Sequence, residues 1–250
     1  MARTPGALDA QILVRIFMRT YFVGAAFNTR GLQTVGLALA MEPALKSLYP
    51  DPAERRMAWR RYLKIYNTHP LWTPFLVGVF LALESRIARG EFPAAMLEQV
   101  KSTMVFTLSA VGDAFFGGAF TTFWALSTAC LLASGHAWIA FFVGALFFVA
   151  LNAFKLGTFI LGYRHGFAAL SRVRNWGLVD WARRVKMVNG ALLVVLWALV
   201  WPREQNPAPW VAGVALTLGC AFAAGRLRMN RELLVGLGVL AGLFFLWTQV

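Results

Sequence analysis

Long apolar runs separated by short basic segments are the feature that most limits what this chain can fold into. Residues 103–134 and 138–163 are long enough to cross a bilayer, which takes about 20 apolar residues in a helix. Shorter apolar segments follow at residues 187–201, 209–225 and 233–247. Only 14% of the residues are charged, whereas soluble domains usually carry about 25%. The sequence therefore predicts an all-α integral membrane protein with about five transmembrane helices.

The basic residues predict how the chain lies in the membrane. Clusters of Lys and Arg at residues 51–64, 171–186 and 226–231 account for much of the formal net charge of +13. Such clusters stay on the cytoplasmic side of the membrane, so we expect a multi-pass membrane protein. The N-terminus then lies on the cytoplasmic side and the C-terminus on the outer side. Because the basic residues flank apolar runs, we expect no nucleic-acid partner.

Two amphipathic helices are predicted before the first apolar run. Apolar residues recur at helical spacing between residues 12 and 23, next to Arg15 and Arg19, which is typical of a helix lying against membrane lipid. Residues 51–66 predict a second interfacial helix that opens at Asp51 or Pro52. Its apolar face would hold Trp59, Leu63 and Tyr66.

The segment between these helices contains a proline. Residues 28–50 are moderately apolar and contain Pro43 directly after Glu42. Proline disrupts the interior of an α-helix because it lacks an N–H and clashes with the preceding turn. We therefore expect a short pair of helices here.

The next segment places polar residues at the mouth of a hydrophobic run. Asn67, Thr68, His69 and Pro70 precede residues 71–84, which are apolar but too short for a straight span. A helix starting at Pro70 could be capped by Asn67 or Thr68. Residues 70–84 are therefore predicted to form a re-entrant segment whose start faces a cavity. The alternative is that His69 only lies among lipid headgroups.

Ionisable residues also occur inside the apolar runs. Glu84, Asp113 and Lys155 are costly in lipid and by default indicate a functional site. Asp113 precedes the Gly117–Gly118 pair, which favours a broken helix around a site. Lys155 could pair with either acid, or extend towards the membrane surface.

Motifs of known catalytic sites do not occur in the sequence. It contains no nucleophile elbow, no zinc-binding pair of histidines and no phosphate-binding glycine loop. Cys130 and Cys220 lie in apolar runs without metal-ligand spacing. We expect no cofactor, no metal and no cleavable signal peptide, because the N-terminal apolar pattern contains charges.

Four stretches together resemble a known membrane family. They are "IFMRTYFVGAAFNTRGLQTVGLALAMEPALKSLYP", "RRYLKIYNTHPLWTPFLVGVFLALES", "SAVGDAFFGG" and "LFFVALNAFKLGTFILGYRHG". In order and spacing, they are similar to the IID membrane subunit of mannose-family sugar phosphotransferase systems. The resemblance covers roughly residues 15–170, and the NTHP element is its most specific part.

The resemblance implies a role in sugar transport. A IID subunit pairs with a IIC membrane subunit, and higher oligomers of such pairs carry a hexose or amino sugar inward. IIA and IIB phosphocarriers supply the phosphoryl group, so the IID subunit is non-catalytic and carries no phosphorylated residue. Asn67, Thr68, His69, Glu84 and Asp113 would bind the substrate. Residues 1–66 would form the interfacial helices, residues 67–170 the transport core, and residues 171–250 the C-terminal transmembrane helices.

The sequence departs from the family pattern at two positions. The stretch "FTLSAVGD" lacks the Gly-Pro pair that usually precedes the Gly-Asp, and "LALES" has one acid, Glu84, where many members have two. These departures keep an alternative open, namely a non-transporting membrane sensor or docking protein on the same scaffold.

Overall fold

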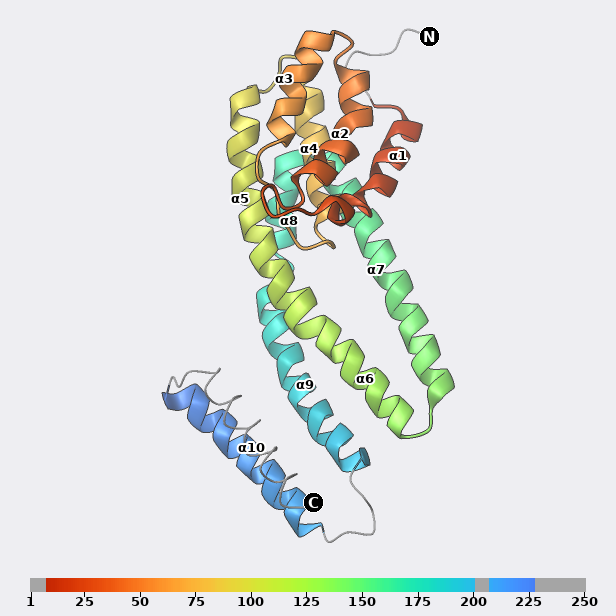
Figure 1. The fold of residues 1–250 in the computed structure, drawn as a ribbon, viewed down its shortest axis with the longest axis vertical. Helices are drawn as coiled ribbons and strands as arrows, with labels where there is room; N and C mark the ends of the chain where they lie inside the picture. Colours follow the sequence, from red (N-terminus) through yellow and green to blue (C-terminus); the bar gives the residue numbers. More distant parts are fainter. Residues whose placement is uncertain (1–7, 201–206, 228–250) are drawn as a thin grey trace. The chain divides into compact units, whose positions relative to one another are not determined.

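The computed structural model describes residues 8–200 and 207–227, and helices are the regular elements in these ranges (Figure 1). The described residues fall into two compact units divided between Leu192 and Leu193. The first unit contains α1 Ala10–Thr20, a 3₁₀ turn Val23–Ala26, α2 Thr34–Leu48, α3 Pro52–Tyr62, α4 Thr73–Ala88, α5 Ala94–Gly112, a π-helical stretch Asp113–Phe120, α6 Thr121–Ala133, α7 Ala137–His165, a second 3₁₀ turn Gly166–Ala168 and α8 Ala169–Arg174. Helix α9 (Leu178–Val200) begins in this unit. The predicted division at residues 66 and 170 stays a prediction.

The second unit contains the end of α9 and α10 (Ala208–Leu227). Within it the rings of Trp197 and Trp210 pack edge to face, with their centroids 6.4 Å apart. The final apolar segment predicted at residues 233–247 lies outside the described residues.

Helix α1 has the predicted amphipathic pattern. Ile16 is fully buried, whereas Arg15 on the neighbouring helix position is exposed. One side of α1 packs on the protein. Its other side is exposed, as a helix that lies against membrane lipid requires.

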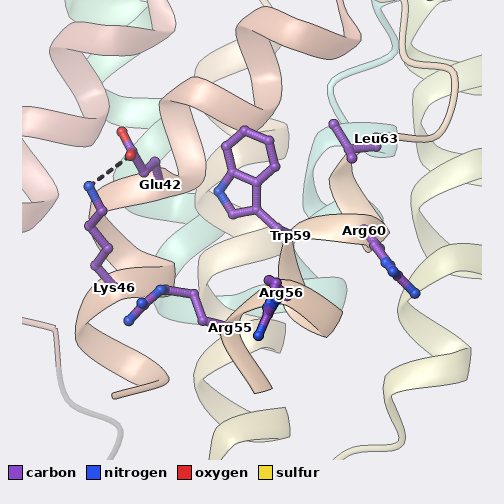
Figure 2. A pocket seen from close by; sticks show the side chains of 7 residues that line it. All are labelled: Glu42, Lys46, Arg55, Arg56, Trp59, Arg60 and Leu63. Carbon is purple, nitrogen blue, oxygen red and sulfur yellow. Dashed lines mark ion pairs between the residues drawn. The ribbon is translucent and has the colours of Figure 1, made fainter. Parts of the chain in front are cut away.

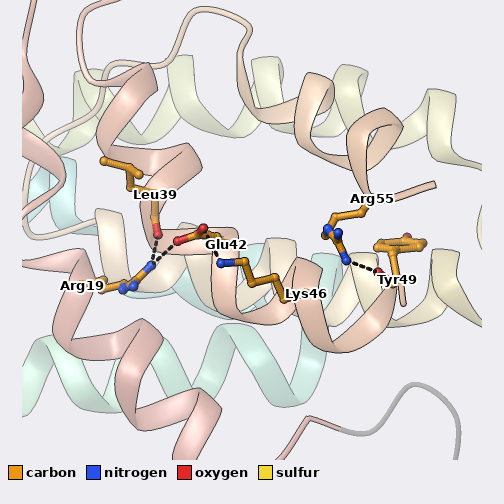
Figure 3. Close-up of polar contacts among 6 residues, drawn as sticks. All are labelled: Arg19, Leu39, Glu42, Lys46, Tyr49 and Arg55. Carbon is orange, nitrogen blue, oxygen red and sulfur yellow. Dashed lines mark hydrogen bonds and ion pairs between the residues drawn. The ribbon is translucent and has the colours of Figure 1, made fainter. Parts of the chain in front are cut away.

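Helix α2 corrects the prediction of a helix pair, because it continues through Pro43. Proline at position 43 cannot donate a hydrogen bond to the carbonyl of Leu39 four residues earlier. Arg19 of α1 takes over this role and donates from Nη1 to Leu39 O at 2.6 Å (Figure 3). The same nitrogen donates to Glu42 Oε2 at 3.1 Å. A side chain from another helix therefore replaces the missing backbone donor.

Helix α3 begins as predicted but ends earlier than expected. Asp51 Oδ2 accepts hydrogen bonds from the backbone N–H groups of Ala53 and Glu54, at 3.0 and 2.8 Å. The helix ends at Tyr62, so the prediction that Leu63 and Tyr66 share its apolar face is wrong. Tyr66 is instead buried, and its carbonyl accepts a hydrogen bond from Gln33 N at 2.9 Å.

Helix α4 lies in the centre of the first unit, and most of its residues are buried. Glycines let it approach α7 closely. A Cβ atom on Gly78 would lie 2.3 Å from Phe159 O, and one on Gly162 would lie 2.4 Å from Phe75 O. Small residues at a crossing are a common way for membrane helices to bring their backbones together.

Two long helical segments have the length and composition to cross a membrane, within the described residues. They are Ala94–Ala133 and Ala137–Arg174, and Figure 1 shows α6 and α7 joined at one end. The connection at residues 134–136 matches the predicted turn near His136. The described part of the chain is thus helical with two candidate membrane spans, while the expected total of about five spans and the re-entrant segment stay predictions.

The predicted break around Gly117–Gly118 does not occur. Residues Asp113–Phe120 form a π-helical stretch that joins α5 to α6 without interruption. Such wide turns release carbonyl groups from the regular pattern. Thr121 Oγ1 donates to Phe116 O at 2.8 Å, and Asn189 Nδ2 donates to Ala119 O at 2.9 Å. These side chains allow the helix to stay continuous.

Candidate functional site

The loop before α4 is held by the segment before α2. Gln33 Nε2 donates to Thr68 O at 3.1 Å, and Thr68 N donates to Gln33 Oε1 at 3.2 Å. The next residue after Gln33 makes a similar bond, in which Thr34 Oγ1 accepts from Tyr66 N at 3.0 Å. Two polar side chains thus fix the backbone on either side of Asn67. The sequence did not single out Gln33 or Thr34, because a polar pair before a helix also fits ordinary capping.

The structure corrects the predicted helix start. Helix α4 begins at Thr73, and its N-cap Trp72 makes no side-chain cap. A tight turn comes first, in which Trp72 N donates to His69 O at 2.8 Å. Because the N-cap residue is Trp72, neither Asn67 nor Thr68 caps the helix. Asn67 is exposed and Thr68 is buried.

His69 packs against the start of the π-helical stretch. Its ring stacks on Phe116 with a centroid distance of 5.4 Å and an angle of 24°. Its Nδ1 accepts a hydrogen bond from Leu71 N at 3.3 Å, so in the neutral imidazole Nε2 carries the proton. A Cβ atom on Gly112 would lie 2.5 Å from His69 Cβ, and glycine at position 112 therefore permits this approach.

Asn67 and Asp113 meet at one open cavity of about 550 Å³. Ser102 and Ser109 of α5 add hydroxyl groups to its lining. The remaining lining residues are apolar or small: Ile65, Val105, Phe106 and Ala110. Ligand pockets commonly combine this volume with a few polar groups on apolar walls. A carboxylate, an amide and two hydroxyls suit a neutral ligand that has several hydroxyl groups.

His69 lies beside this cavity but is not part of its lining. The Asp113 carboxylate and the Lys155 ammonium both act on the imidazole electrostatically, with opposite signs. Lys155 Nζ lies 4.1 Å from the centroid of the Tyr21 ring. Within the described ranges no carboxylate forms an ion pair with it, so neither predicted pairing of Lys155, with Asp113 or with Glu84, occurs there.

Glu84 belongs to a different cluster, in the buried space between α3 and α4. The hydroxyls of Tyr49 and Tyr62 donate to its two carboxylate oxygens at 2.7 and 2.6 Å. Arg61 completes the cluster with an ion pair. Burial, and then the nearby Glu84 carboxylate, raise the pKa of the Tyr49 and Tyr62 hydroxyls, so both stay protonated as donors. Three donors thus surround the Glu84 carboxylate in this cluster.

In residues 8–200 and 207–227, no three acidic, histidine or cysteine side chains gather in a group that could hold a metal ion. The polar residues at the cavity are instead separate hydrogen-bonding groups.

Several solved structures share this fold. One is the cryo-EM structure of the mannose transporter ManYZ in complex with microcin E492, matched with a TM-score of 0.53 and 24% identity over 96% of this chain and 97% of that one. A second membrane-protein structure matches with a TM-score of 0.63, also at 24% identity. At this identity the likeness concerns the fold.

The sequence comparisons identify the family. The fructose permease IID component of Bacillus subtilis is 30% identical over 77% of this chain and 68% of its own length. The mannose-specific EIID component of Escherichia coli K12 is 31% identical over 61% of this chain, but the match spans about half, 53%, of that relative. The sorbose-specific EIID component of Klebsiella pneumoniae is 30% identical over 82% of this chain.

The family description accounts for most of the chain. The sequence model of the IID component of the mannose/fructose/sorbose phosphotransferase systems matches residues 7–200. This range includes the loop around Asn67, the cavity with Asp113 and both long membrane helices. The chain therefore belongs to the IID components of the mannose/fructose/sorbose family of sugar phosphotransferase systems.

Proposed function

We propose that this chain pairs with a IIC subunit in the cell inner membrane to carry a hexose or amino sugar inward. The sugar is phosphorylated by a IIB phosphocarrier, which receives its phosphoryl group from IIA. The observation that carries this proposal is the cavity shared by Asn67 and Asp113, in a chain of the IID family. The N-terminus lies in the cytoplasm, and the C-terminus lies in the periplasm.

The five residues predicted to bind the substrate have different roles in the proposal. The Asp113 carboxylate accepts hydrogen bonds from two neighbouring sugar hydroxyls, and the Asn67 amide both donates and accepts. His69 supports the site from the side, through its stacking on Phe116. Thr68 holds the loop through its backbone bonds to Gln33. Glu84 keeps α3 on α4 and does not touch the sugar.

The location of α4 fits a re-entrant segment. A helix this short, Thr73–Ala88, does not cross the hydrocarbon as a straight span. Irregular backbone such as the turn at His69–Trp72 survives at membrane depth only when protein or a cavity surrounds it. The burial of Trp72 and of most of α4 meets this condition.

The proposal is tested by measuring whether sugar uptake requires this chain. The chain is co-expressed with its candidate IIC, IIA and IIB partners, and phosphoenolpyruvate-dependent uptake is measured over a panel of labelled hexoses and amino sugars. We expect uptake of at least one sugar that disappears when this chain alone is omitted. A stable complex with IIC that transports none of the sugars would instead favour the sensor or docking alternative, to which the missing Gly-Pro pair in "FTLSAVGD" also points.

A further inference from the structure

A second pocket lies between α2 and α3, away from the cavity of Asn67 and Asp113. It has a volume of about 370 Å³ and is shown in Figure 2. Its lining residues are Glu42, Lys46, Arg55, Arg56, Trp59, Arg60 and Leu63. We refer to these residues as the basic pocket.

The positive charge of the basic pocket is not balanced within the protein. Its one carboxylate, Glu42, is already paired with Lys46 at 2.8 Å and with Arg19 at 3.1 Å (Figure 3). These two partners lower the pKa of Glu42 through hydrogen bonds. Across the described part of the chain, no carboxylate pairs with the guanidinium groups of Arg55, Arg56 or Arg60. The pocket therefore attracts an anion from outside the chain.

Two of the three arginines are held in place by backbone groups. Arg55 Nη1 donates to the carbonyls of Tyr49 and Pro50, each at 3.3 Å, and Arg56 Nε donates to Pro52 O at 3.3 Å. These bonds use part of each guanidinium and leave further N–H donors available. Arginine matches the oxygens of a phosphate group with two parallel hydrogen bonds. The chemistry of the pocket thus favours a phosphate-bearing ligand.

The surroundings of the pocket indicate which kind of phosphate. The half-buried Trp59 lines it beside Leu63, and Figure 2 shows the indole ring between Lys46 and Arg60. Leu63 is itself 50% exposed, and Met57, next to Arg56 in α3, is 59% exposed. Exposed apolar side chains beside Trp and Arg are typical of the boundary between lipid chains and headgroups. An acidic soluble protein would leave these apolar side chains without a partner.

We propose that the basic pocket binds the phosphodiester headgroup of an anionic phospholipid, such as phosphatidylglycerol. The guanidinium groups of Arg55 and Arg56 contact the phosphate, Arg60 adds positive charge on the other side of Trp59 (Figure 2), and Trp59 and Leu63 contact the glycerol and the upper acyl chain. The bound lipid fixes α2 and α3 at the membrane surface. This inference depends on the membrane location of the chain but not on the sugar that is transported.

The test measures lipid binding to the full chain purified in detergent. Native mass spectrometry counts bound molecules of dioctanoyl phosphatidylglycerol, with dioctanoyl phosphatidylcholine and inorganic phosphate as separate arms. We expect saturable binding of phosphatidylglycerol, at least about fivefold tighter than that of phosphatidylcholine, because each arginine near an anionic lipid contributes about this factor. Inorganic phosphate should neither bind measurably nor compete at equal concentration. Equal binding of the two lipids, or equal competition by inorganic phosphate, would overturn the proposal.

Two variants of equal charge locate the site. Arg55→Gln/Arg56→Gln/Arg60→Gln should weaken phosphatidylglycerol binding at least about tenfold. The matched control, Arg172→Gln/Arg174→Gln/Arg183→Gln, removes the same charge from the exposed surface of α8 and α9 and should change binding less than about twofold. Equal losses of phosphatidylglycerol affinity in both variants would show that the lipid responds to diffuse surface charge, and would contradict a defined binding site.

A single substitution tests the same site in a variant that is expected to fold. Arg60 is exposed, and Arg60→Gln should fold and still lose about fivefold in affinity. Binding of the IIB phosphocarrier is measured with the same variant in phosphatidylcholine nanodiscs. Unchanged lipid binding combined with weaker IIB binding would assign the pocket to the phosphocarrier instead, and would overturn the lipid proposal.

Discussion

At the residue scale, Pro43 shows how one side chain can replace a backbone hydrogen bond. The sequence rule that proline ends a helix interior failed here, because the freed Leu39 carbonyl accepts from Arg19 of another helix. No property of residues 28–50 alone indicates this partner, since it lies on the preceding helix. Contacts between residues distant in sequence thus decided the outcome.

This account predicts coupling between Arg19 and Pro43. Arg19→Gln should destabilise the chain by about 1–2 kcal/mol, because the Leu39 carbonyl loses its donor. In a Pro43→Ala background the new N–H satisfies that carbonyl, and the same change should cost at least about 0.5 kcal/mol less. Loss of the Glu42 ion pair contributes equally in both backgrounds and cancels.

The coupling is measured by denaturant unfolding of the four proteins in detergent micelles. Arg15→Gln serves as the control, because Arg15 lies exposed on the same helix. Additive effects of the two changes would show that Arg19 does not replace the missing donor.

Glu84 provides a second prediction at this scale. Glu84→Ala leaves the Arg61 guanidinium, whose side chain is 13% exposed, without its counter-charge. Breaking such a buried pair costs about 3–5 kcal/mol. The matched change Glu98→Ala breaks an exposed ion pair with Lys64 and should cost less than about 1 kcal/mol.

Unfolding in micelles checks the stability, and sugar uptake per folded molecule checks the role. We expect Glu84→Gln to retain uptake per folded molecule, since the carboxylate is occupied by protein donors. A fully folded Glu84→Gln protein without uptake would instead support the sequence prediction that Glu84 binds the sugar.

At the element scale, helix boundaries set by local chemistry could be predicted from the sequence. The Asp51 cap of α3 and the turn near His136 are confirmed, since both follow from neighbouring residues. The π-helical stretch was not predicted, because its released carbonyl at Ala119 is satisfied by Asn189, 70 positions away. Likewise Asn67 and Asp113 were selected from their positions at or inside apolar runs and from the family resemblance, and only the fold shows that they share one cavity that Glu84 does not line.

The close crossing of α4 and α7 leads to a prediction about its glycines. Gly78→Ala or Gly162→Ala should destabilise the chain by about 1–3 kcal/mol, because each added methyl would overlap a backbone carbonyl of the other helix. Gly157→Ala on α7 meets no atom within 4 Å and should be neutral or stabilising by up to about 1 kcal/mol.

Thermal unfolding in one detergent compares the three variants. If Gly78→Ala and Gly162→Ala unfold at the same temperature as Gly157→Ala, α4 and α7 do not require this close approach.

At the scale of the whole molecule, membership of the IID family and the cavity of Asn67 and Asp113 together lead to a transport role. The departures from the family motifs do not remove the polar groups of this cavity. Its lining comes from the loop before α4, from α5 and from Asp113 at the start of the π-helical stretch, so this loop and a long helical segment meet at the proposed sugar site. Transport should therefore be sensitive to changes at this junction and tolerant of similar changes elsewhere.

The most direct test of this account measures sugar uptake by Asn67→Ala and Asp113→Asn in the co-expressed complex. Asp180→Asn, the same chemical change at an exposed acid of α9, is the control. We predict that the two cavity variants assemble with IIC and lower uptake at least about tenfold, which corresponds to about 1.4 kcal/mol or one lost hydrogen bond to the sugar, while Asp180→Asn retains uptake. Normal uptake by both cavity variants would contradict the proposed site.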